Sequence, residues 1–171
     1  APRHQGMAYI RTSRPKTEVI YAPTEEFDVG GSKVLRESGS DVVTVVAAGV
    51  TVFEALAAYD RLRSEGISIR VIDAYSVQPV DTETLVSAGL QTGRQLITVE
   101  DHYSVGGLGD AVSEAVANHG ITVARLAVCE VPRSGRSAEL LERYGISSSH
   151  IIAAVHRQAK AGAPPTRADG S

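Results

Sequence analysis

The chain has 171 residues, which is enough for one well-buried domain core. Hydrophobic residues make up 43% and charged residues 22%, as in globular proteins, and no apolar run reaches the roughly 18 residues that a membrane span needs. The net charge of -3 argues against a nucleic-acid-binding surface, which would need clustered Lys and Arg in excess of acids.

The first 40 residues carry two patterns. Residues 7–10 form a short apolar run, and Pro15 favours an extended backbone at Arg14, so we expect Arg14 at the end of a strand. Residues 16–40 are polar and rich in turn signals, apart from the apolar run Val19–Tyr21. We interpret this stretch as a linker with one small strand.

From residue 41, apolar β-branched runs alternate with stretches that have helical apolar spacing. The continuous apolar run at 42–47 is typical of a strand covered on both faces, so it indicates the centre of a parallel sheet. Asp81 is placed to cap a helix. The predicted strands are 42–47, 67–72, 95–100 and 121–128; the predicted helices are one from 49–51 to Gly66, then 82–89 and 108–118, and finally two short ones, 137–144 and one that starts at serines 147–149 and buries Ile151, Ile152 and Val155.

Glu100, Asp101 and His102 lie at the carboxyl end of a predicted strand. A neighbouring acid raises an imidazole pKa, so the three could act as a general acid/base group. In the alternative, both carboxylates accept hydrogen bonds from the following glycine turn and His102 packs at an interface. We favour the alternative, because no Ser, Cys or metal-ligand partner stands at a spacing that completes a catalytic site.

Gly106 and Gly107 precede the predicted helix 108–118, and Gly109 lies in its first turn. Backbone N–H groups at such a corner can cradle a phosphate. However, the third glycine of a dinucleotide fingerprint would fall on Val112, and no lysine completes a phosphate-binding loop. The sequence favours glycines selected for a tight corner and close helix packing.

Three arginines, Arg14, Arg133 and Arg136, could each grip a phosphate or carboxylate in bidentate fashion. Cys129 is the single cysteine, so the chain has no internal disulfide and nothing suggests secretion. We expect Cys129 to be a buried small hydrophobe rather than a nucleophile, because no adjacent base would lower its pKa.

Four motifs, in this order, resemble the C-terminal third of transketolase, particularly its animal-like branch. They are residues 9–15, residues 45–56, residues 98–109 and residues 131–135. The resemblance covers residues 6 to about 157 and implies a doubly wound, mostly parallel α/β sheet. Transketolases move a two-carbon ketol unit between sugar phosphates, in the pentose phosphate pathway, with thiamine diphosphate and a divalent metal, Mg or Ca.

The resemblance implies a role for one residue of this chain. Arg14 matches the family arginine that contacts the sugar phosphate, whereas Arg11 is expected to be structural. Catalytic, cofactor-binding and metal-binding residues are expected in parts not in this chain. The implied division is a remnant of the pyrimidine-binding domain at 1–15, contributing its last strand, a linker at 16–40, the transketolase C-terminal domain at 41–160 and a disordered tail at 161–171.

The implied partners are the remaining transketolase domains or subunit, a second copy in a homodimer, and sugar phosphates, with no nucleic acid and no membrane. The implied location is cytoplasmic. The alternative is a non-catalytic dimerisation or subunit-docking module of a thiamine enzyme. A more distant alternative is a small-molecule sensor at Gly106–Gly109.

Overall fold

A computed structural model of the chain describes residues 5–13 and 16–161. Its centre is a five-stranded sheet in the order β1-β3-β2-β4-β5. The β2, β3, β4 and β5 strands are parallel, and β1 runs antiparallel to β3 at one edge. The strands are β1 (Lys33–Arg36), β2 (Thr44–Ala47), β3 (Arg70–Asp73), β4 (Gln95–Tyr103) and β5 (Thr122–Val128).

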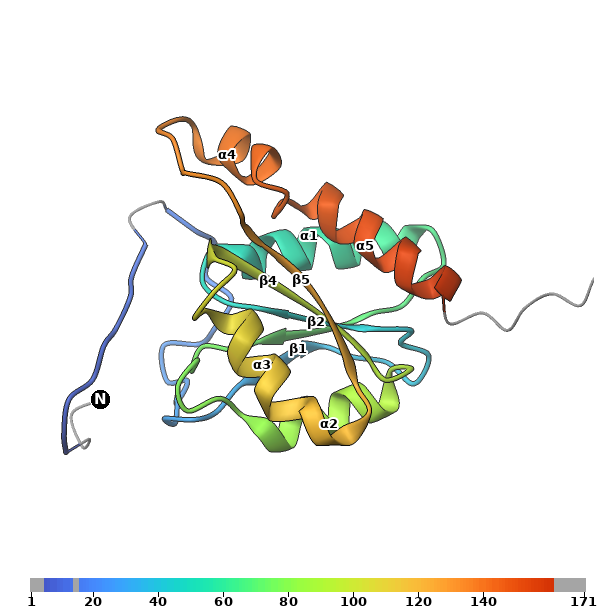
Figure 1. The fold of residues 1–171 in the computed structure, drawn as a ribbon, viewed down its shortest axis with the longest axis horizontal. Helices are drawn as coiled ribbons and strands as arrows, with labels where there is room; N and C mark the ends of the chain where they lie inside the picture. The colour runs from blue at the N-terminus through green and yellow to red at the C-terminus, as the bar shows by residue number, and fades with distance from the viewer. Residues whose placement is uncertain (1–4, 14–15, 162–171) are drawn as a thin grey trace, which may run out of the picture.

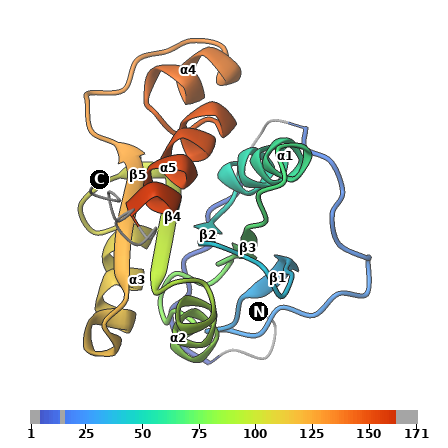
Figure 2. The ribbon, with the colours of Figure 1, turned by 90° about the vertical axis from the view of Figure 1, so that its right-hand side faces the viewer.

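Helices cover both faces of this sheet (Figures 1 and 2). The α1 and α5 helices pack on one face, and α2 and α3 pack on the other. Within the described residues, no helix is long and apolar enough to cross a membrane. The packing of helices on both faces of a mostly parallel sheet confirms the predicted doubly wound α/β fold. The helices are α1 (Thr51–Ser64), α2 (Thr82–Gln91), α3 (Leu108–Val116), the 3₁₀ turn η1 (Ala117–His119), α4 (Ser137–Arg143) and α5 (Ser148–Ala161).

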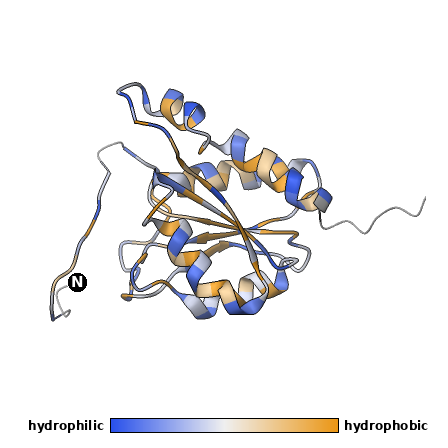
Figure 3. Cartoon of the chain, viewed as in Figure 1, coloured by the Kyte–Doolittle hydropathy of each residue, from blue (hydrophilic) through white to orange (hydrophobic). Residues whose placement is uncertain are grey.

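Successive side chains of the central strands enter two separate cores, because neighbouring residues of a strand point to opposite faces. In β2, Val45 packs with α1 and α5, whereas Val46 packs with α2 and α3. Figure 3 shows the resulting apolar centre between helices whose outer faces are polar. Burial on both faces explains the continuous apolar run that identified this strand. Ile151, Ile152 and Val155 of α5 are buried as predicted.

The N-terminal part differs from the prediction. Neither Val19–Tyr21 nor residues 7–10 form a strand; both stretches lack regular secondary structure. Instead, β1 forms within the expected linker 16–40, with an alternating half-buried and exposed pattern. These two short apolar runs were wrongly predicted as strands, because a strand also needs a neighbouring strand with which to form hydrogen bonds.

Smaller differences concern element ends. The β4 strand continues to Tyr103, three residues past its predicted end, and α5 has 14 residues rather than being short. The predicted cap of α2 is confirmed, since Asp81 accepts a hydrogen bond from the N–H of Thr84 at 3.1 Å. The expected tail at 161–171 lies, after its first residue, outside the described residues.

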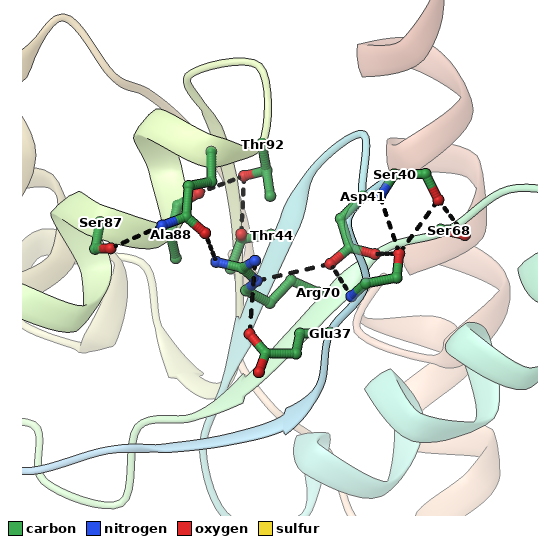
Figure 4. A network of polar contacts seen from close by, with 11 residues as sticks. Glu37, Ser40, Asp41, Thr44, Ser68, Arg70, Ser87, Ala88 and Thr92 are labelled. Carbon is green, nitrogen blue, oxygen red and sulfur yellow. Dashed lines mark hydrogen bonds and ion pairs between the residues drawn. The ribbon is translucent and has the colours of Figure 1, made fainter.

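A polar network lies at the edge of the sheet where β2 and β3 begin and β1 ends (Figure 4). Arg70, at the start of β3, donates to Gln91 Oε1 of α2 at 2.9 Å, and its guanidinium lies 3.6 Å from carboxylates of Glu37 and Asp41. These contacts join the residue after β1, the entry to β2, the start of β3 and the end of α2. The network is structural and leaves the carboxyl edge, where ligands usually meet such sheets, as the place where a functional site is expected.

Candidate functional site

The carboxylate of Glu100 caps the first turn of α3. Its Oε2 accepts a hydrogen bond from the N–H of Leu108 at 2.6 Å, and its Oε1 accepts one from the N–H of Gly109 at 2.9 Å. Glu100 is only 3% exposed, and its negative charge lies where helix N–H groups lack partners within the helix. The possible phosphate cradle at Gly106–Gly109 is therefore filled by a side chain of the same chain.

Two of the glycines make room for this cap. A Cβ on Gly107 would clash with Oε2 of Glu100, and a Cβ on Gly109 would lie 2.5 Å from Nε of Arg125. These contacts support the interpretation of the glycines as residues of a tight, closely packed corner.

A second carboxylate closes the loop before α3. Asp110 Oδ2 accepts a hydrogen bond from the N–H of Gly106 at 2.5 Å, and its Oδ1 lies 2.8 Å from Nη1 of Arg125. The hydrogen bond from Gly106, and then the charge of Arg125, hold the pKa of Asp110 below its ordinary value, although desolvation acts in the opposite direction. Arg125 also donates to the carbonyl of Ser104. The loop is thus held by side chains of α3 and β5.

Asp101 faces the N-terminal segment. Both of its carboxylate oxygens accept hydrogen bonds from the guanidinium of Arg11, at 2.9 and 2.7 Å. The favoured interpretation, in which the glycine turn donates to Asp101, is therefore wrong for this carboxylate: its partner, Arg11, lies 90 positions away in the sequence.

His102 does not complete a proton-transfer group. Its Nδ1 lies 3.0 Å from the carbonyl of Tyr103, a contact in which the nitrogen donates, and its side chain is exposed. Within the described residues, no hydrogen bond joins His102 to Glu100 or Asp101. Both carboxylates are already engaged with other donors, so the geometry favours their structural role over general acid/base catalysis.

An aromatic cluster lies at the carboxyl end of β3. Tyr21 donates a hydrogen bond to Oδ2 of Asp73 at 2.6 Å, and the ring of Phe27 stands edge-on to the rings of Tyr21 and Tyr75, each with a centroid separation of 4.9 Å. Burial, opposed by the Tyr21 hydrogen bond, raises the pKa of Asp73. The cluster pins residues 21–27 to the sheet, and nothing in the sequence spacing pointed to it.

Two of the three candidate arginines, Arg133 and Arg136, lie within the described residues. Arg14 lies outside the described residues. Arg133 donates its backbone N–H to the hydroxyl of Tyr144 at 2.7 Å, and the side chain of Arg136 is 87% exposed and 3.8 Å from Glu139. Within the described residues, no hydrogen bond or ion pair joins Arg133 to Arg136.

The prediction of a buried Cys129 is wrong, because the thiol is exposed. The β5 strand ends at Val128, so Cys129 belongs to the loop that follows and does not continue the buried run. In the described part of the chain, no three His, Cys, Asp or Glu side chains are grouped so that they could hold a metal ion.

The family follows from comparison of the sequence with known families. The sequence model of the family described as "Transketolase, C-terminal domain" matches residues 30–151, which include the whole sheet and the start of α5. The chain belongs to the transketolase C-terminal domain family. The family match starts three residues before β1, so it includes the edge strand of this transketolase C-terminal domain.

Curated relatives of this transketolase C-terminal domain include transketolases and transketolase-like proteins. Transketolase-like protein 1 of Bos taurus is 55% identical over 154 residues, which cover 90% of this chain and 26% of that protein. Transketolase of Homo sapiens is 48% identical over 156 residues, which cover 91% of this chain and 25% of that protein. The chain therefore spans about a quarter of the length of these relatives.

Two solved structures have a similar fold. A structure described as "Split gene transketolase, inactive beta4 tetramer" superposes with a TM-score of 0.76 at 37% identity, covering 84% of this chain and 46% of the other. Transketolase from Campylobacter jejuni superposes with a TM-score of 0.58 at 19% identity, covering 80% of this chain and 20% of the other. The second structure supports the fold alone.

Proposed function

We propose that the chain is the C-terminal portion of a thiamine diphosphate-dependent transketolase, which transfers a two-carbon ketol unit between sugar phosphates. The observation that carries this proposal is 48% identity to a protein named transketolase over 91% of the chain. Since the chain spans about a quarter of that relative, the activity belongs to the whole protein and not to this portion alone.

The role proposed for this chain is to hold the far end of the substrate. The guanidinium of Arg14 would bind the sugar phosphate through two charge-assisted hydrogen bonds, a geometry that lysine cannot offer. Binding energy at the remote phosphate positions the ketose for reaction at the other end of the molecule.

Thiamine diphosphate and the divalent metal are proposed to bind to other parts of the protein. The described residues do not fit either group, since Glu100 occupies the N–H groups at the start of α3 and no group of metal-binding side chains is formed. No step of ketol transfer is therefore assigned to the described residues.

The chain is also proposed to supply contacts to a second copy and to the remaining domains or subunit, in the cytoplasm. The split-gene relative is described as an inactive β4 tetramer, which is consistent with a portion that assembles but does not react alone. The second candidate function is a non-catalytic docking module of a thiamine enzyme. The inactive tetramer and the transketolase-like relatives are also consistent with this function.

Substitution of Arg14 distinguishes the two functions. The chain alone is expected to show no ketol transfer, and turnover by the chain alone would contradict the proposal. When the upstream transketolase domains are supplied, Arg14→Ala should raise the KM for a sugar phosphate, whereas the docking function predicts no change. Arg61→Gln, at an exposed position of α1, is the matched control.

A further inference from the structure

Within the described part of the chain, the polar contacts between the N-terminal segment, residues 5–13, and the domain all involve Asp101. Every side chain in this segment is exposed, and the segment has no regular secondary structure. Figure 1 shows it lying apart from the helices, on the side of the molecule where β4 ends. Among the described residues, the hydrogen bonds of this segment to the rest of the molecule are those of Arg11 to Asp101.

The contact between Arg11 and Asp101 is directional as well as electrostatic. Nη1 and Nη2 of Arg11 each donate to a different oxygen of the Asp101 carboxylate, and Nη2 also lies 3.3 Å from the backbone carbonyl of Asp101. This fork uses the planar geometry of the guanidinium, so it fixes the direction of approach as well as the distance.

Asp101 is a fixed point of the fold. It belongs to β4, and the preceding residue, Glu100, is buried and bonded to two N–H groups of α3. The side chain of Asp101 is 26% exposed, whereas that of Arg11 is 51% exposed. Of the two partners, Asp101 is the less exposed and belongs to the sheet, whereas Arg11 belongs to the exposed segment.

We infer that Arg11 and Asp101 are positioning residues that hold the segment leading to Arg14 at the carboxyl edge of the sheet. The inference rests on the proposed function, in which Arg14 binds the sugar phosphate. Arg14 follows Arg11 by only three positions in the chain, so covalent geometry keeps their Cα atoms within about 11 Å. Fixing Arg11 therefore limits where the phosphate-binding side chain can lie.

The test uses the assembled protein, with the upstream transketolase domains supplied. Asp101→Asn removes the charge and Arg11→Lys removes the fork, and the double variant Arg11→Asp/Asp101→Arg exchanges the partners. The values of KM and kcat are measured with a pentulose 5-phosphate and with the free pentulose. Arg14→Ala is measured alongside, and Arg61→Gln is the control.

The single variants are expected to raise the KM for the phosphorylated sugar by about two- to fivefold, the range that partly exposed ion pairs support, and to leave kcat unchanged. The KM for the free sugar is expected to stay constant, and the exchanged pair should recover most of the loss. An equal change with both sugars, or no change with either, overturns the inference.

Failure of the inference can be distinguished from failure of the proposed function. If Arg14→Ala raises the KM for the phosphorylated sugar and the pair variants do not, only the positioning role is lost. If Arg14→Ala has no effect, both fail. A second measurement does not depend on enzyme activity. Spin labels are attached at Ala8→Cys and Glu114→Cys in a Cys129→Ser background, and the distance between them is expected to have a narrow distribution that Asp101→Asn broadens. An unchanged distance distribution overturns the inference.

Discussion

At the scale of single residues, Glu100 is the side chain on which the β4–α3 corner depends most. Glu100→Ala would leave the buried N–H groups of Leu108 and Gly109 without an acceptor, so we expect a loss of about 2–4 kcal/mol in the free energy of unfolding. Glu100→Gln keeps one acceptor oxygen and should lose about half as much. Urea unfolding followed by circular dichroism measures both changes.

The control for Glu100 is Glu114→Gln, at an exposed position of the same helix. It should change the unfolding free energy by less than about 0.5 kcal/mol, as expected for a surface position. Equal losses for Glu114→Gln and Glu100→Gln would show that the net charge of α3, and not the cap, is responsible.

The contacts of residues at this edge were predictable only where they are local. Glu100 and the glycine corner lie within nine positions of each other, so the sequence indicated that a carboxylate accepts hydrogen bonds from the glycine turn. Asp101 was assigned to the same turn, but its partner is Arg11, at a separation of 90 residues. No local pattern encodes such a pair, because only the fold brings the two residues together.

At the scale of elements, residues 21–27 are attached to β3 by the aromatic cluster. Tyr21→Phe removes the donor to the buried carboxylate of Asp73, and a hydrogen bond to a charged group contributes about 1.5–3 kcal/mol. We expect a loss of that size at neutral pH, measured by urea unfolding. Tyr9→Phe, at a side chain that is 89% exposed, is the control and should have no effect.

The titration of Asp73 makes the free energy of unfolding depend on pH. Burial raises the pKa of Asp73 above 3.8, so the folded state holds the proton more tightly than the unfolded state. Its contribution to stability is therefore full below 3.8 and falls as the pH rises through the raised folded value.

Asp73→Asn removes this titration. The unfolding free energy of the variant, relative to the wild type, should therefore increase between about pH 3 and pH 7. Urea unfolding at several pH values across this range measures the difference. A difference that stays constant or decreases with pH would contradict the shift.

The β1 strand is an element that the sequence did not predict. The core strands could be predicted from the sequence, because burial on both faces of the sheet requires a continuous apolar run. In contrast, β1 is a four-residue edge strand with a charged residue at each end, Lys33 and Arg36, and its partner β3 lies more than 30 positions later in the chain. Its short alternating pattern resembles a turn-rich linker, and only pairing with β3 makes it a strand.

At the scale of the whole molecule, alternation of strands and helices was enough to predict a parallel α/β layer structure, and the resemblance to transketolase added its doubly wound form. The periodicity did not specify the strand order, which places β2 between β3 and β4. The strand order depends on which face of the sheet each connecting helix covers. The residues that decide this belong to two cores, each built from several elements, so no single segment of the sequence specifies the order.

The same two cores predict how the molecule tolerates truncation. Among the described residues, the fully buried apolar side chains start at Val43, and the polar contacts of residues 5–13 with the sheet are those of Arg11 with Asp101. Removal of residues 1–13 should therefore change the unfolding free energy by less than about 1 kcal/mol.

Removal of residues 1–32 also deletes Tyr21 and Phe27, with the hydrogen bond to Asp73 and two aromatic contacts. The expected loss is about 2.5–6 kcal/mol, since each of the two aromatic pairs adds about 0.5–1.5 kcal/mol to the hydrogen-bond contribution of about 1.5–3 kcal/mol. Thermal and urea unfolding of the two truncated chains provide the comparison. Equal losses would mean that the attachment of the N-terminal region lies in the ion pair and not in the aromatic cluster, because the shorter truncation keeps the cluster intact.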